Sequence, residues 1–177
     1  MAPRKLMNYI MVATATLLLL GAVQSPQAEA RKFAGVNPFC RTASYRRSCT
    51  QMVNGAANWH DASANAIKAT IDLAKRLKGL VPTIEPAIAH LEPMSRDSIR
   101  ESCADSFDNV VDDLQVSLQA LEAGDIGTVK SYLSSAVAAD CRDSLKEFGI
   151  GAEFPLNKYS DHLTQKVDNC LAVIMQE

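Results

Sequence analysis

Apolar residues recur at intervals of three and four along most of the chain, and this spacing constrains the fold more than any other feature. Residues 62–77, 99–121, 129–148 and 159–174 each carry one such stripe. The spacing places the apolar side chains of each stretch on one face of a helix, and that face must be buried. Long helices joined by short loops favour antiparallel packing. The sequence therefore predicts an all-α protein, an up-down-up-down four-helix bundle.

Polar and glycine residues mark the expected ends of these helices. Ser95 or Ser98 can cap the second helix, and Gly124 is expected to end it. Asp125 can cap the third helix, which is expected to run as far as Gly149. The four stripes are thus separated by residues that suit turns.

Three prolines, Pro82, Pro86 and Pro93, follow the first stripe. Ile84 and Ile88 keep the helical spacing between them. A proline inside a helix removes a hydrogen-bond donor and clashes with the preceding turn. This stretch is therefore either one kinked helix or two short helices.

The N-terminus has the order of a secretory signal peptide. Arg4 and Lys5 precede an apolar run over residues 10–23, and Ala28-Glu29-Ala30 provides a small-x-small cleavage site. The alternative is an uncleaved membrane anchor, but the run is shorter than the roughly 18 to 20 residues that span a bilayer. We expect cleavage after Ala30, no membrane association afterwards, and one domain over 31–177. That domain would consist of an N-terminal hairpin over 31–55 and the bundle over 56–177.

The charge balance excludes one class of function. The chain has 18 Lys and Arg against 20 Asp and Glu, and 47% of its residues are hydrophobic. A nucleic-acid-binding protein needs a basic face, and this composition offers none. The apolar content is that of a folded domain. We expect a globular protein that binds no nucleic acid.

The chain has five cysteines. Because the expected secretion leads to an oxidising compartment, we expect them to form disulfides. Pairing Cys40 with Cys49 is local, and pairing Cys103 with Cys141 suits facing positions on an antiparallel helix pair. Cys170 then remains, either as a buried free thiol or for intermolecular pairing. No Cys-x-x-Cys occurs and no His stands at ligand spacing from a Cys, so neither a metal nor a cofactor is expected.

The sequence lacks the motifs of the common enzyme classes. There is no Gly-x-Ser-x-Gly elbow, no phosphate-binding glycine loop and no His-Glu-x-x-His. His60, His90 and His162 are widely separated in the sequence. We expect that the protein is not an enzyme.

Four segments together resemble one known family. They are Cys-Arg-Thr-Ala-Ser-Tyr-Arg-Arg-Ser-Cys at 40–49, the acidic amphipathic stretch at 102–114, the stretch at 129–141 that ends in Asp-Cys, and Asp-Asn-Cys-Leu-Ala-Val-Ile at 168–174. With the spacing of four cysteines, they resemble the plant invertase and pectin methylesterase inhibitor family. Arg46 stands where members usually have Pro, and Cys170 stands where they usually have a small apolar residue.

The resemblance implies a four-helix bundle preceded by a short helical hairpin and stapled by Cys40–Cys49 and Cys103–Cys141. It also implies a secreted inhibitor of a carbohydrate-active enzyme, located in the apoplast or cell wall. Invertase inhibitors of the family often carry Pro-Lys-Phe at the start of the third bundle helix, where this chain has Gly-Asp-Ile-Gly-Thr-Val-Lys at 124–130. Pectin methylesterase is therefore the favoured partner, bound 1:1 over its substrate cleft, and invertase is the alternative. A non-inhibitory helical module that holds a ligand between its helices is a further alternative.

A polar stripe lies opposite the apolar stripe of the second helix. Its members follow a four-three spacing that makes one continuous face. The stripe is either an ordinary solvated surface or the inhibitory face, and carboxylates there could mimic an anionic polymer. Serines on the third helix could extend it, or could pack at the contact between helices. The candidate interface residues are Glu101, Asp105, Asp108, Asp112, Gln115, Gln119, Ser131, Ser134 and Ser135.

Overall fold

The computed structural model describes residues 34–138, 141, 145–146, 148–150 and 156–176. The expected signal peptide over 1–30 lies outside these residues. The compact unit Val36–Glu177 contains all the helices described below. Within the described ranges, no helix combines the length and the apolar character that crossing a bilayer would require.

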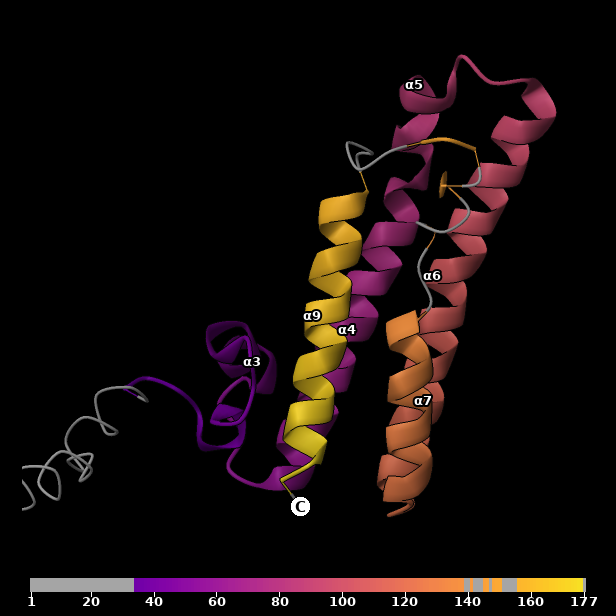
Figure 1. Cartoon of the computed structure of the whole chain (residues 1–177). Coiled ribbons are helices and arrows are strands. Elements are labelled where there is room, and N and C mark those ends of the chain that lie inside the picture. Colours follow the sequence, from indigo (N-terminus) through magenta and orange to yellow (C-terminus); the bar gives the residue numbers. More distant parts are fainter. Residues whose placement is uncertain (1–33, 139–140, 142–144, 147, 151–155, 177) are drawn as a thin grey trace, which may run out of the picture. The chain divides into compact units, whose positions relative to one another are not determined.

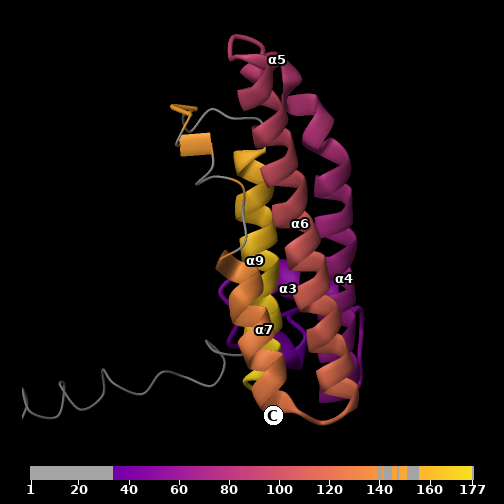
Figure 2. The same ribbon diagram turned by 90° about the vertical axis from the view of Figure 1, so that its right-hand side faces the viewer.

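Four helices form the body of this unit: α4 (Trp59–Leu80), α6 (Pro93–Glu122), α7 (Ile126–Ala138) and α9 (Asn157–Ile174). Each packs against two neighbours, in the order α4, α6, α7, α9 and back to α4. Successive helices run in opposite directions (Figures 1 and 2). The described residues contain no strand. The predicted all-α, up-down-up-down four-helix bundle is confirmed.

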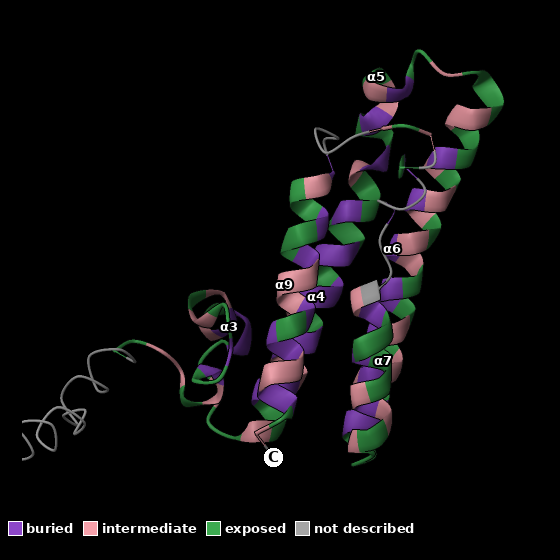
Figure 3. Ribbon diagram, in the orientation of Figure 1, coloured by how far each residue is buried: buried purple, intermediate pink, exposed green. Residues whose placement is uncertain are grey.

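The apolar stripes meet in one core. Buried positions line the inner sides of the four helices, and exposed positions lie outside (Figure 3). Burying a Leu, Ile or Phe side chain contributes roughly 1.5 to 3 kcal/mol each, so these stripes supply the main driving force for the bundle. The largest fully buried side chains of the long helices are Ile67, Leu77, Ile99, Phe107, Leu114, Leu121, Leu133 and Ile174.

The proline-containing stretch forms two short helices after α4. A 3₁₀ helix, η2 (Val81–Ile84), leads into α5 (Glu85–Ile88). Pro82 and Pro86 lie in the first turn of these helices, where the missing N–H is not needed. Ile84 and Ile88 are fully buried. The first bundle element thus continues beyond α4 without an internal proline kink.

Two expectations about helix ends are wrong. Neither Ser95 nor Ser98 caps α6, because the helix already begins at Pro93. The third helix is shorter than expected, since α7 ends at Ala138 and Cys141 lies in a turn. A continued helix would place Asp140 on the same face as buried Val129 and Leu133, and burying an unpaired carboxylate is costly. The apolar positions after Ala138 therefore do not belong to the same helix.

An N-terminal hairpin lies against one end of the bundle. It consists of η1 (Pro38–Cys40) and α3 (Arg46–Val53), and α3 contacts both α4 and α9. The Asn169 side chain on α9 donates a hydrogen bond to the carbonyl oxygen of Tyr45 at 3.4 Å, and Asn65 on α4 donates one to that of Val53 at 3.1 Å. These bonds fix both ends of α3 on the bundle.

Each disulfide ties a different part of the fold. Cys40–Cys49 closes the hairpin, and Cys103–Cys141 joins α6 to the turn that follows α7. All four cysteines are fully buried. Cys170 is a buried free thiol on α9, and its sulfur lies 3.3 Å from Thr70 Oγ1 on α4. Burial raises the pKa of the Cys170 thiol to about 12.

Candidate functional site

The polar stripe of α6 faces away from the core. We call Glu101, Asp105, Asp108, Asp112, Gln115 and Gln119 the acidic face. All of these residues are exposed except Asp108, which is half-buried. From its first to its last residue the face extends about 27 Å, at 1.5 Å of rise per residue. One rigid helix thus presents six polar side chains in a row.

Asp108 differs from the other carboxylates of the acidic face. Lys78 on α4 donates to both of its oxygens, with Nζ 2.7 Å from Oδ1 and 2.5 Å from Oδ2. The pair is about half exposed, so its free energy is small, but it turns Asp108 toward α4 and offsets its charge. By contrast, neither Asp105 nor Asp112 forms an ion pair with another described residue. Glu101 is likewise exposed and forms no ion pair with a described residue, so the uncompensated negative charge of the face lies on Glu101, Asp105 and Asp112.

The three candidate serines lie on the solvent side of α7. Ser131, Ser134 and Ser135 are exposed, while the core side of the same helix is occupied by Val129 and Leu133. The Ser134 hydroxyl donates to the carbonyl oxygen of Lys130 at 2.8 Å. Since α6 and α7 pack against each other, the serines and the acidic face lie on neighbouring helices (Figure 2). The serines are surface groups and do not pack in the helix contact.

A tight turn fixes α7 beside α6. Gly124 takes a left-handed backbone conformation with φ of 73°, which a residue with a side chain adopts only at a cost. Asp125 then accepts hydrogen bonds from the Thr128 backbone N–H at 3.0 Å and hydroxyl at 2.7 Å, so it caps α7. These hydrogen bonds lower the pKa of the Asp125 carboxyl. The expected cap at Asp125 and the helix end at Gly124 are confirmed.

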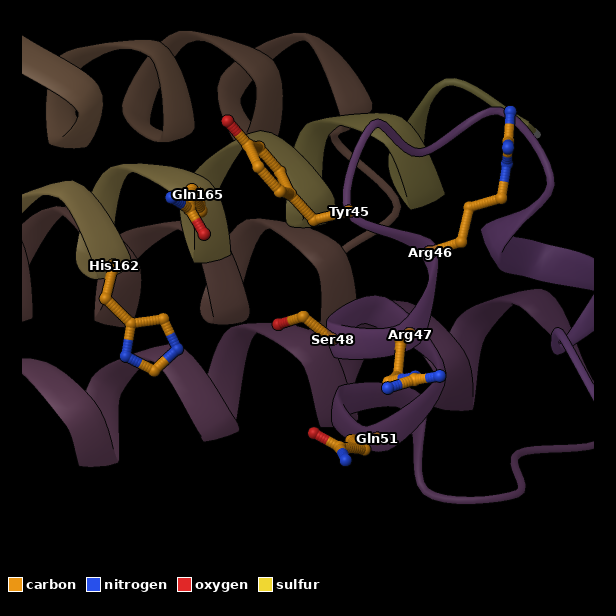
Figure 4. A pocket seen from close by; sticks show the side chains of 7 residues that line it. All are labelled: Tyr45, Arg46, Arg47, Ser48, Gln51, His162 and Gln165. Atoms are coloured by element: carbon orange, nitrogen blue, oxygen red, sulfur yellow. The ribbon is translucent and has the colours of Figure 1, made fainter.

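A polar hollow between the hairpin and the bundle is a second candidate site. Its volume is about 430 Å³, in the range of small-ligand sites. Side chains of α3 and of α9 line opposite sides (Figure 4). Arg46 borders the hollow but points away from it, and its Nε donates to the Arg41 carbonyl oxygen at 3.0 Å. The lining residues are Tyr45, Arg46, Arg47, Ser48, Gln51, His162 and Gln165.

Positive charges gather beside this hollow. Partial burial lowers the pKa of His162, and the positive charges of Lys166 and Arg76 lower it further. Partial burial also lowers the pKa of Lys166, and the charge of Arg76 adds to this effect. In the sequence only Arg46 and Arg47 are adjacent, whereas Arg76 and Lys166 come from α4 and α9. Folding therefore creates a site that sequence periodicity does not reveal.

The metal-ligating and histidine side chains of the described residues are dispersed over the fold. No group of three or more His, Cys, Asp or Glu among them could hold a metal ion. His60, His90 and His162 lie on different elements: the start of α4, the turn after α5, and α9. The acidic face of α6, the exposed serines of α7 and the hollow are thus the candidate binding surfaces of the described residues.

Comparisons with known proteins agree with the fold. Two similar solved structures are a pectin methylesterase inhibitor from Arabidopsis thaliana and a mutant form A of a pectin methylesterase inhibitor from Arabidopsis. The mutant form has a TM-score of 0.61 and 16% identity, covering 78% of this chain and 93% of its own. The other has a TM-score of 0.56 and 16% identity, covering 80% and 95%.

A search of curated proteins found no match to the chain. The family model described as plant invertase/pectin methylesterase inhibitor matches residues 34–173, which include the hairpin and the four bundle helices apart from the last residue of α9. Members of this family inhibit enzymes and are not themselves enzymes, as was expected of this chain. The chain belongs to the plant invertase/pectin methylesterase inhibitor family.

Proposed function

We propose that this protein inhibits a pectin methylesterase by binding it 1:1 and covering its substrate cleft. Its family consists of inhibitors, and the two similar solved structures are pectin methylesterase inhibitors. The observation that carries the choice of surface is the set of exposed carboxylates in the acidic face that form no ion pair with a described residue: Glu101, Asp105 and Asp112. A cleft that accepts an anionic polymer offers basic or polar groups, which such carboxylates can meet.

The acidic face has the size and the rigidity that an inhibitory surface needs. About 27 Å of helix, widened by the exposed serines of α7, can contribute to an interface of ordinary size. The Gly124–Asp125 turn and the packing of α6 on α7 hold both helices before binding, so little order has to be acquired on association. Charge complementarity on such a surface mainly raises the association rate and the specificity.

The proposed site of action is outside the cell, in the apoplast. We propose that residues 1–30 act as a cleaved signal peptide and that residues 31–177 form the inhibitor domain. Two buried disulfides support this placement, because disulfides persist in oxidising compartments.

Titration of the oxidised protein against a pectin methylesterase and an acid invertase tests the proposed target. We expect stoichiometric loss of methylesterase activity and no effect on the invertase. The turn before α7 lacks the Pro-Lys-Phe motif that invertase inhibitors often carry. Inhibition of the invertase alone would move the target to the alternative, and inhibition of neither would refute the proposal.

A charge-matched pair of variants tests the proposed surface. Asp105→Asn with Asp112→Asn removes two unpaired carboxylates from the acidic face, and we expect about tenfold weaker inhibition with a reduced salt dependence. Asp72→Asn with Asp168→Asn removes the same charge from exposed positions on α4 and α9. This control is expected to change affinity less than twofold. Equal losses from both pairs would show that net charge, and not the acidic face, governs binding.

A further inference from the structure

The hollow between α3 and α9 has the lining of a saccharide site. Two carboxamides, Gln51 and Gln165, and two hydroxyls, on Ser48 and Tyr45, border it. Each of these groups can both donate and accept a hydrogen bond, as can the hydroxyl groups of a sugar. In Figure 4, Ser48 and Gln51 extend from α3 toward the side of the hollow on which His162 hangs from α9. The ring of Tyr45 adds an apolar face.

No ion pair among the described residues neutralises the cations near the hollow. Arg47, Arg76 and Lys166 form no ion pair with any described residue. The charges that shift the pKa of His162 are those of Lys166 and Arg76, and the pKa of Lys166 is shifted by the Cys170 thiol and by Arg76. None of these groups is a carboxylate. Lys166 is half-buried and lies within the field of the positive Arg76, which costs free energy that a bound anion would recover.

The two properties together define the ligand. Four neutral polar side chains line the hollow, whereas Arg47 is the one lining guanidinium that does not point away from it. A ligand that matches this lining consists mostly of hydroxyl groups. The positive charge of Arg47, together with those of Lys166 and Arg76 near His162, favours a ligand that also bears negative charge. We propose that the hollow binds a short acidic oligosaccharide, with a uronate carboxylate beside Arg47 and sugar hydroxyls on Ser48, Gln51 and Gln165.

This site is separate from the acidic face and does not depend on the proposed inhibitory function. The hollow is built by α3 and α9, whereas the acidic face belongs to α6. Substituting Asp105 and Asp112 should therefore leave saccharide binding unchanged. Likewise, a failure to bind saccharide would not count against the proposed inhibition of an enzyme.

Calorimetric titration of the oxidised protein with three probes tests the proposal. The probes are trigalacturonate, its fully methyl-esterified counterpart and inorganic phosphate. We expect trigalacturonate to bind, the methyl ester to bind at least tenfold more weakly, and phosphate not to bind. Equal affinity for the ester would overturn the role of the carboxylates. Equal affinity for phosphate would reduce the hollow to a general anion site, and absence of trigalacturonate binding would refute the proposal.

Variants locate the binding. Arg47→Gln should weaken trigalacturonate binding at least fivefold, while Arg46→Gln removes the same charge from a side chain that points away and should change it less than twofold. Gln51→Ala, an exposed position, should weaken the ester and the acid alike by removing a hydroxyl contact. Unchanged affinity in both Arg47→Gln and Gln51→Ala would place the ligand elsewhere and refute the assignment.

Discussion

The buried thiol of Cys170 permits a quantitative test of the packing between α4 and α9. The sulfur is fully buried and lies 3.3 Å from Thr70 Oγ1. Burial raises the pKa of Cys170 from 9.0 to about 12. At pH 8 a thiol with the ordinary pKa is about one-tenth thiolate, and one with a pKa of 12 is about one ten-thousandth thiolate. Because the thiolate is the nucleophile, folding should slow alkylation about a thousandfold, before steric protection is counted.

The assay is alkylation by iodoacetamide at pH 8 without reductant, followed by mass spectrometry. We expect exactly one label per chain in denaturing urea and about a thousandfold slower labelling in buffer. Cys170→Ala is the control and should accept no label in either condition, because the other four cysteines are paired. Native labelling within tenfold of the unfolded rate would refute the buried position of the thiol, and label on any other cysteine would refute the disulfide pairing.

Two further predictions concern stability. Replacing Cys103 and Cys141 by Ala should cost about 4 kcal/mol of unfolding free energy, and replacing Cys40 and Cys49 about 2.5, because the longer loop of 38 residues restricts the unfolded chain more than that of 9. Urea denaturation measures both, and the reverse ranking would exclude loop entropy as the cause. Asp125→Ala should lower the thermal midpoint at pH 7. Since the folded pKa of this carboxyl is depressed, its contribution is present above pH 4 and is lost as pH falls through the folded value. The difference in midpoint from wild type should therefore shrink in acid, and a constant difference would contradict the role of the charged cap.

Helical periodicity and capping preferences correctly predicted the features that depend on residues close together in the sequence. Ile99, Phe107 and Leu114 recur at helical spacing, and all three are fully buried on α6. Asp125 caps α7 through Thr128, three residues away. Such features follow from the 3.6-residue period and from the unsatisfied N–H groups of a helix start, both of which can be read along the chain. The fold class and the order of the helices could therefore be predicted.

The same preferences failed at two helix ends, where signals for different end positions lie close together in the sequence. Ser95 and Ser98 both suit a cap, but a proline at the first helical position is equally favourable and stands earlier. The apolar spacing after Ala138 suggested a longer third helix, although a continued helix would have brought Asp140 to the core face. Burial of a carboxylate is costly, which disfavours a continuation of this kind.

The sequence alone determined the helices, the faces that they bury and the outward position of the acidic stripe, because each follows from the turn of a single helix. Only the tertiary structure decided which of those outward carboxylates pairs with a cation, since Lys78 on α4 reaches Asp108 on α6. Tertiary structure also created the hollow, whose cationic surroundings combine α3, α4 and α9. Charge interactions depend on distance in space, and the chain brings Arg47 and His162 to one hollow although 115 positions separate them.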